Sequence, residues 1–410
     1  MDLWIWKIFQ LIKNNELMEK ININEIRTMP SDLEFGFCVF GKPSEKVESW
    51  AKSWGFRIQE GSGGYTNILV PKNYDISECF DKFSQYKYVD GFSPNLNKHL
   101  HVGHMSNFIL AKAFQSMNVG EEFISILGDT LEGAVEKHEA YKMYQTYCDV
   151  FGLDVSKIFY ASHMTYLGGK LEDGEGEYKG TKVFNTGEEK IVGIKSDGST
   201  SYFYQDMALA DVLDAPTLYL TGHEQDGHFS NLKKFYPNTN HIGLGLVKLK
   251  TKMSSRDGNV IFFNDLIEDC LKEFNNDWNL VYNVLAGFIL KIEPTKDKKI
   301  DMELLKNPKN SPGLYLSYTL ARLTSAGVRG AKVDDKFNST ELQFKYMKSL
   351  CNLQPNILFN ALAEHCKIIN NLYVTHRIEG NPENIVMFGN LKEDLELGMK
   401  KLGLFLVDKV

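Results

Sequence analysis

The sequence predicts an α/β protein in which a doubly wound parallel sheet is followed by an all-α bundle and preceded by a small α+β module. Three observations indicate this fold class. Strand-like and helix-like segments alternate from Tyr86 to about residue 265, which is typical of parallel sheets. Beyond about residue 265 the apolar residues follow helical spacing. Before Tyr86, short strand-like runs are separated by glycine-rich turns.

Composition places the chain among globular proteins with more than one domain. It has 410 residues, of which 43 % are hydrophobic and 24 % charged. The net charge of -7 argues against bulk electrostatic binding of nucleic acid but allows a local basic groove. The six cysteines form no C-x-x-C pair, so we expect a reducing, cytoplasmic location and no metal site. No stretch is long and apolar enough to span a membrane, and no membrane partner is expected.

The first half of the predicted sheet lies between Tyr86 and residue 160. Tyr86–Phe92 has the pattern of a strand, and apolar residues at helical spacing follow from Val102. Glu122–Leu127 is a compact buried-strand run, a helix is predicted across Ala134–Val150, and another strand near Ile158–Tyr160. This order of segments predicts two strand–helix–strand units in one parallel sheet.

A polar, glycine-rich segment at about 165–190 interrupts the alternation and is predicted to be an insertion between the two halves of the sheet. Alternation then resumes. The further segments are a strand at Lys190–Lys195, a helix at Phe203–Val212, a strand at Thr217–Thr221, a helix at Gly227–Lys234 and a strand at His241–Leu249.

The C-terminal third is predicted to form a helical bundle. Its helices are expected at Leu266–Phe274, Leu280–Leu290, Gly313–Ala326, Ile357–Leu372 and Asn390–Leu402. We therefore expect three domains: an N-terminal module at 1–88, a sheet domain at 89–265 and a helical domain at 266–410.

Two histidines mark the clearest candidate site. His101-Val-Gly-His104 lies between a predicted strand and the start of a helix, where free backbone N–H groups and the helix dipole favour an anion. Gly103 lets a base or ribose approach the backbone closely. A second candidate, Lys252-Met-Ser-Ser-Arg256, puts two cations and two hydroxyls on a predicted mobile loop that can close over phosphate. Each motif alone also has an ordinary explanation: unrelated surface histidines for the first, and a solvated turn for the second, for which this is the commoner case.

The motifs together resemble the arginyl-tRNA synthetases, a family of class I aminoacyl-tRNA synthetases. The resemblance rests on SPNLNKHLHVGH, KSDGSTSYFYQDMALAD, LYLTGHEQDGHF, KMSSRDGNV, NSPGLYLSYTLARLTS and LELGMKKLGLFLV, which follow one another between residues 93 and 407. It implies a Rossmann-like catalytic domain with a C-terminal anticodon-binding-like helical domain. It also implies ATP, with Mg²⁺ bound to the ATP, as cofactors, and L-arginine and tRNA(Arg) as partners. We expect a monomer.

The resemblance also implies roles for individual residues. ATP would be bound by His101, Gly103, His104, Lys252 and Met253. The mobile loop would act through Lys252, Ser254 and Arg256, with Lys98 compensating for the family's second loop lysine, which is Ser255 here. Arginine would be bound by Asn95, Glu177, Tyr202, Asp206 and Gln225.

The arginine-binding set also makes sense on physical grounds. A guanidinium is planar and permanently charged, so a selective pocket needs carboxylates and a ring or hydroxyl partner. Tyr202 and Asp206 are four residues apart and therefore on one face of their predicted helix. An ordinary surface carboxylate remains the alternative for Asp206, and more so for Glu177 in its polar insertion.

Several departures from the family leave the acceptor open. Ser106-Asn107 stands where the family has Arg-Ser, and Thr130 begins a run that the family replaces with Trp-Gly-Thr-Gln. The chain is also short for the family. Three functions therefore remain: an arginine–tRNA ligase, a paralogue that activates arginine for a non-tRNA acceptor, and a non-catalytic relative that binds tRNA or arginine.

Overall fold

The computed structural model describes residues 19–28, 36–70, 74–81, 83, 85–94, 100–128, 137–164, 169–250, 263–304, 307, 310–330 and 336–410. The chain divides into two compact units. The first combines Met1–Ser84 with Arg322–Gly398, and the second combines Gln85–Ala321 with Met399–Val410. We call them unit 1 and unit 2 and describe each by itself. The three predicted domain ranges remain a prediction.

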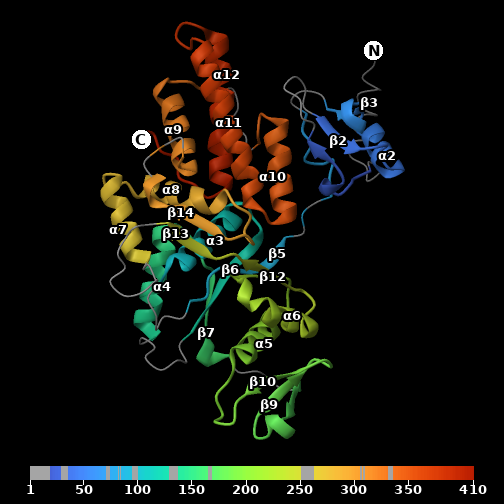
Figure 1. Cartoon of the computed structure of the whole chain (residues 1–410), viewed down its shortest axis with the longest axis vertical. Helices are drawn as coiled ribbons and strands as arrows, with labels where there is room; N and C mark the ends of the chain where they lie inside the picture. The colour runs from blue at the N-terminus through green and yellow to red at the C-terminus, as the bar shows by residue number, and fades with distance from the viewer. Residues whose placement is uncertain are drawn as a thin grey trace. The chain divides into compact units, whose positions relative to one another are not determined.

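A five-stranded parallel sheet forms the centre of unit 2, as the sequence predicts (Figure 1). Its strands are β5 (Tyr86–Asp90), β6 (Gly120–Leu127), β7 (Lys157–Tyr160), β11 (Thr217–Gly222) and β12 (Thr239–Leu244). Their spatial order is β12-β11-β5-β6-β7. The chain thus builds the sheet outward from β5 in one direction and then returns to build β11 and β12 on the other side, which confirms the doubly wound α/β class.

Four helices connect these strands. They are α3 (Val102–Ser116), α4 (Lys137–Phe151), α5 (Tyr202–Leu213) and α6 (Asp226–Phe235). α3 contacts α4, β6 and β11, and α5 contacts α6. Most of α3 is apolar and buried because it packs against both strands and helices, so its sequence carries only a weak amphipathic pattern.

The topology places a crevice between β5 and β11. β5 is the strand from which the order reverses, and β11 is its neighbour, with Thr217 opposite Tyr88 and Tyr219 opposite Asp90. In open parallel sheets, the carboxyl ends of the two strands at such a reversal leave a crevice that suits a ligand.

A three-stranded antiparallel sheet forms the insertion. Its strands are β8 (Leu171–Asp173), β9 (Lys182–Asn185) and β10 (Lys190–Ile194). Phe184, Ile191 and Ile194 pack on the apolar side of α5, and Figure 1 shows β9 and β10 beyond α5. Lys190–Lys195 was expected to resume the parallel sheet, and this is wrong because β10 pairs with β9 through a turn too short for a parallel crossover.

The expected strand at His241–Leu249 is also divided. It ends in the main sheet at Leu244, and β13 (Val247–Lys250) then pairs in parallel with β14 (Lys298–Asp301). Gly245 and Leu246 change the direction of the chain, because their N–H groups bond Pro294 and Asp297 instead of the sheet. The helices of this part are α7 (Phe263–Glu273), α8 (Trp278–Leu290) and α9 (Pro312–Ser325).

Unit 1 joins the N-terminal module to C-terminal helices. The module is a four-stranded sheet of order β1-β2-β4-β3 with one long helix, α2. The bounds are β1 Arg27–Thr28, β2 Gly36–Phe40, α2 Glu45–Ser53, β3 Arg57–Glu60, β4 Tyr65–Leu69, α10 Thr340–Asn352, α11 Pro355–Thr375 and α12 Pro382–Lys401. Phe344 of α10 lies in the core formed by Phe37, Trp50 and Phe80 of the module.

Short 3-10 helices occur at Ile23–Glu25, Ser62–Gly64, Ala161–His163, Gly176–Tyr178, His223–Gln225 and Met302–Leu304. Helix α10 was not expected from the sequence. No helix in the described part of the chain is long and apolar enough to cross a membrane.

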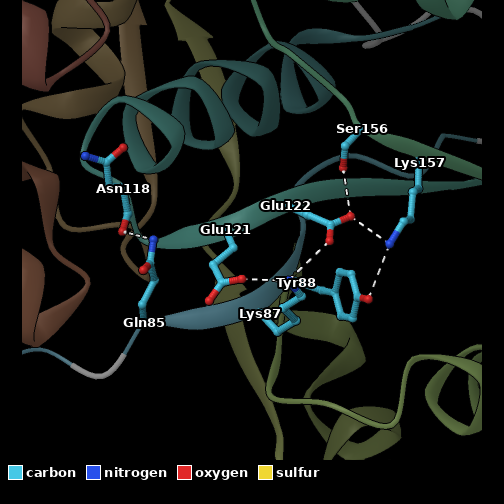
Figure 2. A network of polar contacts seen from close by, with 8 residues as sticks. All are labelled: Gln85, Lys87, Tyr88, Asn118, Glu121, Glu122, Ser156 and Lys157. Atoms are coloured by element: carbon cyan, nitrogen blue, oxygen red, sulfur yellow. Dashed lines mark hydrogen bonds and ion pairs between the residues drawn. The ribbon is translucent and has the colours of Figure 1, made fainter.

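A network of charged side chains joins the starts of β5, β6 and β7 (Figure 2). Lys87 Nζ lies 2.6 Å from Glu121 Oε2 and 3.4 Å from Glu122 Oε1. Lys157 Nζ lies 2.7 Å from Glu122 Oε2 and 4.8 Å from the centre of the Tyr88 ring. Lys157, followed by Lys87, lowers the pKa of the half-buried Glu122 carboxyl. These contacts link the three strands at the end of the sheet away from the crevice.

Candidate active site

Two adjoining cavities open at the carboxyl ends of β5 and β11. We call the first the histidine pocket, because His101 and His104 line it together with Gly103, and the second the carboxylate pocket, because Asp90 and Asp206 line it. Their volumes are about 470 and 490 Å³. Each is large enough for part of a small-molecule ligand.

His101 begins α3 and satisfies its first N–H groups. The backbone N–H of Gly103 donates to His101 Nδ1 at 3.1 Å, and the backbone N–H of His101 donates to His104 Nδ1 at 3.0 Å. The two rings stack with their centres 4.0 Å apart. The pair therefore forms a reciprocal cap that orders the turn between β5 and α3.

This bonding fixes where the imidazole protons lie. Burial lowers the pKa of His101, and burial together with His101 lowers the pKa of His104 to about 4. Both rings are thus neutral near pH 7, and since each Nδ1 accepts a hydrogen bond, each proton lies on Nε2. The histidine pocket therefore presents two N–H donors beside the N-terminus of α3, an arrangement suited to phosphate oxygens.

Gly103 is required by a close approach within the turn. A Cβ atom at this position would lie 2.9 Å from His101 Cε1 and 3.0 Å from its Nδ1. Any larger residue would therefore push the first histidine out of its capping position. Gly103 was expected to let a ligand approach the backbone, and it also leaves room for the His101 imidazole in its capping position.

Asp90 is the buried carboxylate of the second cavity. It is 4 % exposed at the end of β5 and accepts a hydrogen bond of 2.6 Å from the Ser93 hydroxyl. Burial, with a further contribution from the charge of Asp206, raises the pKa of Asp90 to about 7. A cation placed in this pocket would stabilise the ionised form of Asp90.

Asp206 reaches the same cavity from α5, one helical turn after Tyr202. Its Oδ2 lies 2.6 Å from Nε2 of His228, which α6 contributes. Tyr202 and Gln205 line the cavity as well, and Phe229 contributes an aromatic face. Tyr202 and Asp206, four residues apart on α5, both line this cavity.

A buried hydroxyl lies beside the two carboxylates. Tyr219 is 1 % exposed on β11, and its hydroxyl has no hydrogen-bond partner within the described ranges. Burial, followed by the charges of Asp206 and Asp90, raises the pKa of Tyr219. Buried polar groups are normally paired, so this hydroxyl is an exception to that rule, and Tyr219 is not among the residues that line either cavity.

The two cavities share one wall. Its residues are Ser93, Thr221, Glu224 and Gln225. Ser93 is already engaged, since its oxygen accepts the backbone N–H of Ile126 at 2.9 Å while its hydroxyl donates to Asp90. A ligand that extends from one cavity to the other must pass this wall.

The structure brings most of the described candidate residues together. His101, Gly103 and His104 lie in the histidine pocket, Tyr202 and Asp206 lie in the carboxylate pocket, and Gln225 lines both. Six candidates lie outside the described residues: Asn95, Lys98, Lys252, Met253, Ser254 and Arg256.

Glu177 is not brought to either cavity. It lies exposed in the 3-10 helix between β8 and β9, and it is absent from the residues that line the carboxylate pocket. The insertion packs on α5 through its apolar strands and leaves this helix in solvent. Asp90 stands in the pocket instead, as the second carboxylate beside Asp206.

Sequence reasoning missed the roles of Asp90 and His228. The sequence did indicate Asp90, because a carboxylate near the end of a predicted buried strand can find polar partners only at the edge of the sheet. His228 lies within the motif LYLTGHEQDGHF, but no role was assigned to it, because its contact with Asp206 joins residues on two different helices.

Two departures from the expected pattern have visible consequences. Ser106 is buried in α3, and its hydroxyl is one of five buried side-chain polar atoms without a hydrogen-bond partner in the described part. Asn107 lines the histidine pocket, and its Nδ2 donates to the backbone oxygen of Leu220 at 3.5 Å, which links α3 to β11. Thr130 lies outside the described residues. Among those described, no group of three or more His, Cys, Asp or Glu side chains could hold a metal ion.

Known proteins with similar sequences share one name. No family model matches the chain. Over 333 residues it is 23 % identical to an arginine–tRNA ligase of Clostridium botulinum, a match that covers 66 % of the chain and 58 % of that protein. It is 30 % identical over 226 residues to an arginine–tRNA ligase of Treponema denticola, covering 42 % of the chain and 36 % of that protein. The chain is thus similar in sequence to arginyl-tRNA synthetases.

Solved structures agree on the fold. The arginyl-tRNA synthetase of Thermus thermophilus superimposes with a TM-score of 0.64 at 15 % identity, covering 94 % of the chain and 96 % of that structure. The arginyl-tRNA synthetase of Plasmodium falciparum gives a TM-score of 0.61 at 14 % identity and full coverage of both chains. In sequence, the aligned part spans about half the length of the first curated synthetase relatives, 44 % and 58 % of two of them.

Proposed function

We propose that the chain activates L-arginine with ATP and transfers the arginyl group to the 3′ end of tRNA(Arg). The observation that carries this proposal is the pair of adjoining cavities: two carboxylates line one, and two neutral imidazoles at a helix N-terminus line the other. A ligand with a cationic end and an end that must meet phosphate fits this arrangement. The names of the sequence relatives support arginine and tRNA as the substrates.

The carboxylate pocket would bind the guanidinium group. Asp206, held by His228 at 2.6 Å, and the buried Asp90 supply acceptors for a planar group with five donors. Tyr202 and Phe229 supply the aromatic wall against which such a cation packs. The ionised Asp90 carboxylate, which burial disfavours in the free protein, becomes favourable once the cation is bound.

The histidine pocket would bind the phosphates of ATP. His101 and His104 direct Nε2–H donors to the ligand without adding a charge that must be neutralised later. The N-terminus of α3 adds the positive end of its helix dipole. Mg²⁺ would arrive with the ATP, because this ion prefers phosphate oxygens and water. Lys98 and the Lys252–Arg256 loop remain candidates for further phosphate contacts.

The chemistry needs positioning more than a protein nucleophile. An oxygen of the arginine carboxylate attacks the α-phosphorus, the bond to the β-phosphate breaks, and pyrophosphate leaves. A ribose hydroxyl of tRNA then attacks the activated carbonyl, loses its proton, and AMP departs. The shared wall, where Thr221, Glu224 and Gln225 lie, is the place at which the carboxylate would meet the α-phosphate.

Charging of total tRNA with labelled arginine and ATP tests the proposal, run beside arginine-dependent release of AMP without tRNA. We expect the label to be recovered as stable arginyl-tRNA. AMP release without charged tRNA would replace tRNA with another acceptor, and the absence of both activities would leave only a binding role.

A substitution in the carboxylate pocket tests the substrate assignment. Asp206→Asn keeps the shape of the side chain and a hydrogen bond with His228 while removing the charge. We expect the KM for arginine to rise by roughly 10-fold or more, as for the loss of a charge-assisted hydrogen bond, with the KM for ATP unchanged. Glu177→Gln is the matched control in the exposed insertion, and an equal effect of both variants would contradict the assignment.

A further inference from the structure

A buried lysine that the proposed chemistry does not use lies at the start of β14. Lys298 is 1 % exposed, although lysine side chains are rarely buried so completely. Its Nζ donates to the backbone oxygen of Pro294 at 2.7 Å and to that of Lys296 at 3.0 Å. The backbone N–H of Lys296 also donates to the oxygen of Glu293 at 3.0 Å, which closes a turn. We call residues 293–298 the lysine turn.

The ammonium group of Lys298 holds this turn together. Burial lowers the pKa of Lys298 to about 8, while the charges of Asp297 and Glu293 act in the opposite direction. The group is therefore mostly charged near pH 7, and a charged donor forms stronger hydrogen bonds than a neutral one. Because a buried charge is costly unless hydrogen bonds satisfy it, the two carbonyl groups are expected to stay in place around the ammonium.

The lysine turn also bonds the segment that leads from β12 to β13. The oxygen of Pro294, which accepts from the Lys298 ammonium, accepts the backbone N–H of Gly245 at 3.0 Å as well. The backbone N–H of Lys298 donates to the oxygen of Leu246 at 2.7 Å. The N–H of Leu246 in turn donates to Asp297 Oδ1 at 3.0 Å. These bonds tie Gly245 and Leu246 to the turn, and β13 then continues beside β14 (Figure 1).

The turn and Gly245 are also in direct backbone contact. A Cβ atom at position 245 would lie 2.2 Å from the carbonyl carbon of Lys296 and 2.6 Å from the backbone nitrogen of Asp297. Such distances leave no room for a side chain between the two segments. The position of the lysine turn therefore determines the position of Gly245.

Gly245 and Leu246 line the histidine pocket. His101, Gly103 and His104 line the same cavity from the start of α3. Neither Gly245 nor Leu246 is among the residues that line the carboxylate pocket. The lysine turn thus supports a wall that belongs to the histidine pocket and not to the carboxylate pocket.

We propose that Lys298 is a positioning residue for ATP, because its ammonium orders the turn that holds Gly245 and Leu246 in the wall of the histidine pocket. This inference rests on the proposed function, since it requires ATP in that pocket. Lys298 contacts no substrate and acts through the oxygen of Pro294 and through its own backbone N–H. Its side chain therefore affects the binding of ATP and not the binding of arginine.

Calorimetric titration with ATP and Mg²⁺, without arginine or tRNA, tests this role. Lys298→Met keeps an unbranched apolar side chain and removes the donors to Pro294 and Lys296. The dissociation constant of ATP should rise roughly 10-fold, the usual effect of losing a hydrogen bond from a charged group. The dissociation constant of arginine, titrated separately, should change by less than about twofold, as for an independent site. Lys299→Met, the same substitution at the exposed neighbouring lysine, should change neither constant.

Steady-state charging of tRNA separates positioning from a general loss of structure. Lys298→Met should raise the KM for ATP roughly 10-fold while kcat stays within about twofold of the unaltered value, as expected when binding alone is weakened. A purely structural role would lower kcat through a smaller folded fraction and leave KM unchanged, and that result would overturn the inference.

Gly245→Ala provides a second variant in case Lys298→Met does not fold. Its methyl group would meet the carbonyl group of Lys296 and displace the turn without removing the ammonium. This variant should also weaken the binding of ATP but not of arginine. Unchanged binding of ATP in Gly245→Ala would overturn the inference.

The outcomes distinguish this inference from the function on which it rests. If the unaltered protein does not bind ATP, the proposed function is wrong, and the inference is wrong with it. If the unaltered protein binds ATP but Lys298→Met binds it equally well, or weakens ATP and arginine to the same extent, Lys298 does not position ATP. The inference is then wrong while the function stands.

Discussion

At the scale of the residue, ionisation of the buried Asp90 carboxyl lowers the free energy of unfolding of the free protein. Its carboxyl is buried at the end of a strand, near a second carboxylate, and its pKa is raised to about 7. Such a group favours folding only while it is protonated. A bound guanidinium would reverse this preference, so the property that makes the free pocket unfavourable would give it affinity for a cation.

Asp90→Asn should therefore stabilise the protein as the pH rises. In the folded state Asp90 keeps its proton up to about pH 7, whereas in the unfolded chain it loses the proton near its ordinary value of 3.8. Relative to the variant, the free energy of unfolding of the unaltered protein thus falls by about 1.4 kcal/mol per pH unit between pH 4 and pH 7. Urea unfolding at pH 5 and pH 8 measures the difference, and parallel curves for the two proteins would contradict the assignment.

Arginine binding should release protons near neutral pH. In the free protein Asp90 is partly protonated at pH 7, and the guanidinium favours its ionised form. Affinity for arginine should accordingly rise from pH 6 to pH 8. Calorimetry in two buffers with different ionisation enthalpies gives the number of protons released, and the Asp90→Asn variant should release fewer. Binding without any proton release would show that Asp90 stays protonated in the complex.

At the scale of the element, α3 begins with residues that serve both folding and binding. His101 caps the helix through Nδ1 while its ring lines the histidine pocket, and His104 Nδ1 accepts a hydrogen bond from the backbone N–H of His101. Because the cap consumes Nδ1 of both rings, the helix start itself determines which nitrogens remain as donors for a ligand.

His101→Asn separates the two roles. Asparagine is among the best N-cap residues, so this variant should keep the stability of the unaltered protein within about 0.5 kcal/mol, whereas His101→Ala should lose about 1 kcal/mol. Both variants should lose ATP-dependent turnover, because the imidazole donor is gone. Thermal unfolding and AMP release measure the two effects, and full turnover in His101→Asn would exclude this histidine from phosphate binding.

At the scale of the whole molecule, each of the two compact units combines segments that are far apart in the sequence. Unit 1 joins the first residues of the chain to helices that lie more than 300 residues later, and unit 2 carries both cavities. The union in unit 1 is an aromatic core in which Phe344 lies with its ring centre 5.0 Å from that of Phe37 and 5.8 Å from that of Phe80. Stability of unit 1 therefore depends on residues from both ends of the chain.

Phe344→Ala should destabilise unit 1 by about 3–5 kcal/mol, the usual cost of removing a fully buried phenylalanine side chain. Arginine binding in unit 2 should persist. Phe151→Ala is the matched variant in unit 2, where this ring stacks on Phe108 at 4.8 Å. Calorimetric unfolding measures the stability of each variant, and titration with arginine measures its binding. Loss of arginine binding in Phe344→Ala but not in Phe151→Ala would contradict this prediction.

The sequence predicted the parallel sheet and most helices because alternation of buried strands and helices is a local pattern. It also predicted His101, His104, Tyr202 and Asp206, whose short spacings bring them to one turn or one helix face. It could not predict α10 in the core of the N-terminal module, or the contact of Asp206 with His228, since both depend on packing between distant segments. Glu177 was included through the resemblance, and the structure places it exposed in a 3-10 helix.

Selectivity for the guanidinium tests the central claim most directly. Citrulline has nearly the same shape as arginine, but its ureido group is uncharged. Calorimetric titration of both amino acids into the unaltered protein should show arginine binding and citrulline binding at least 100-fold more weakly, because the buried Asp90 and Asp206 carboxylates would face a group without charge. Equal affinity for the two ligands, or no binding of arginine, would contradict the assignment of the carboxylate pocket.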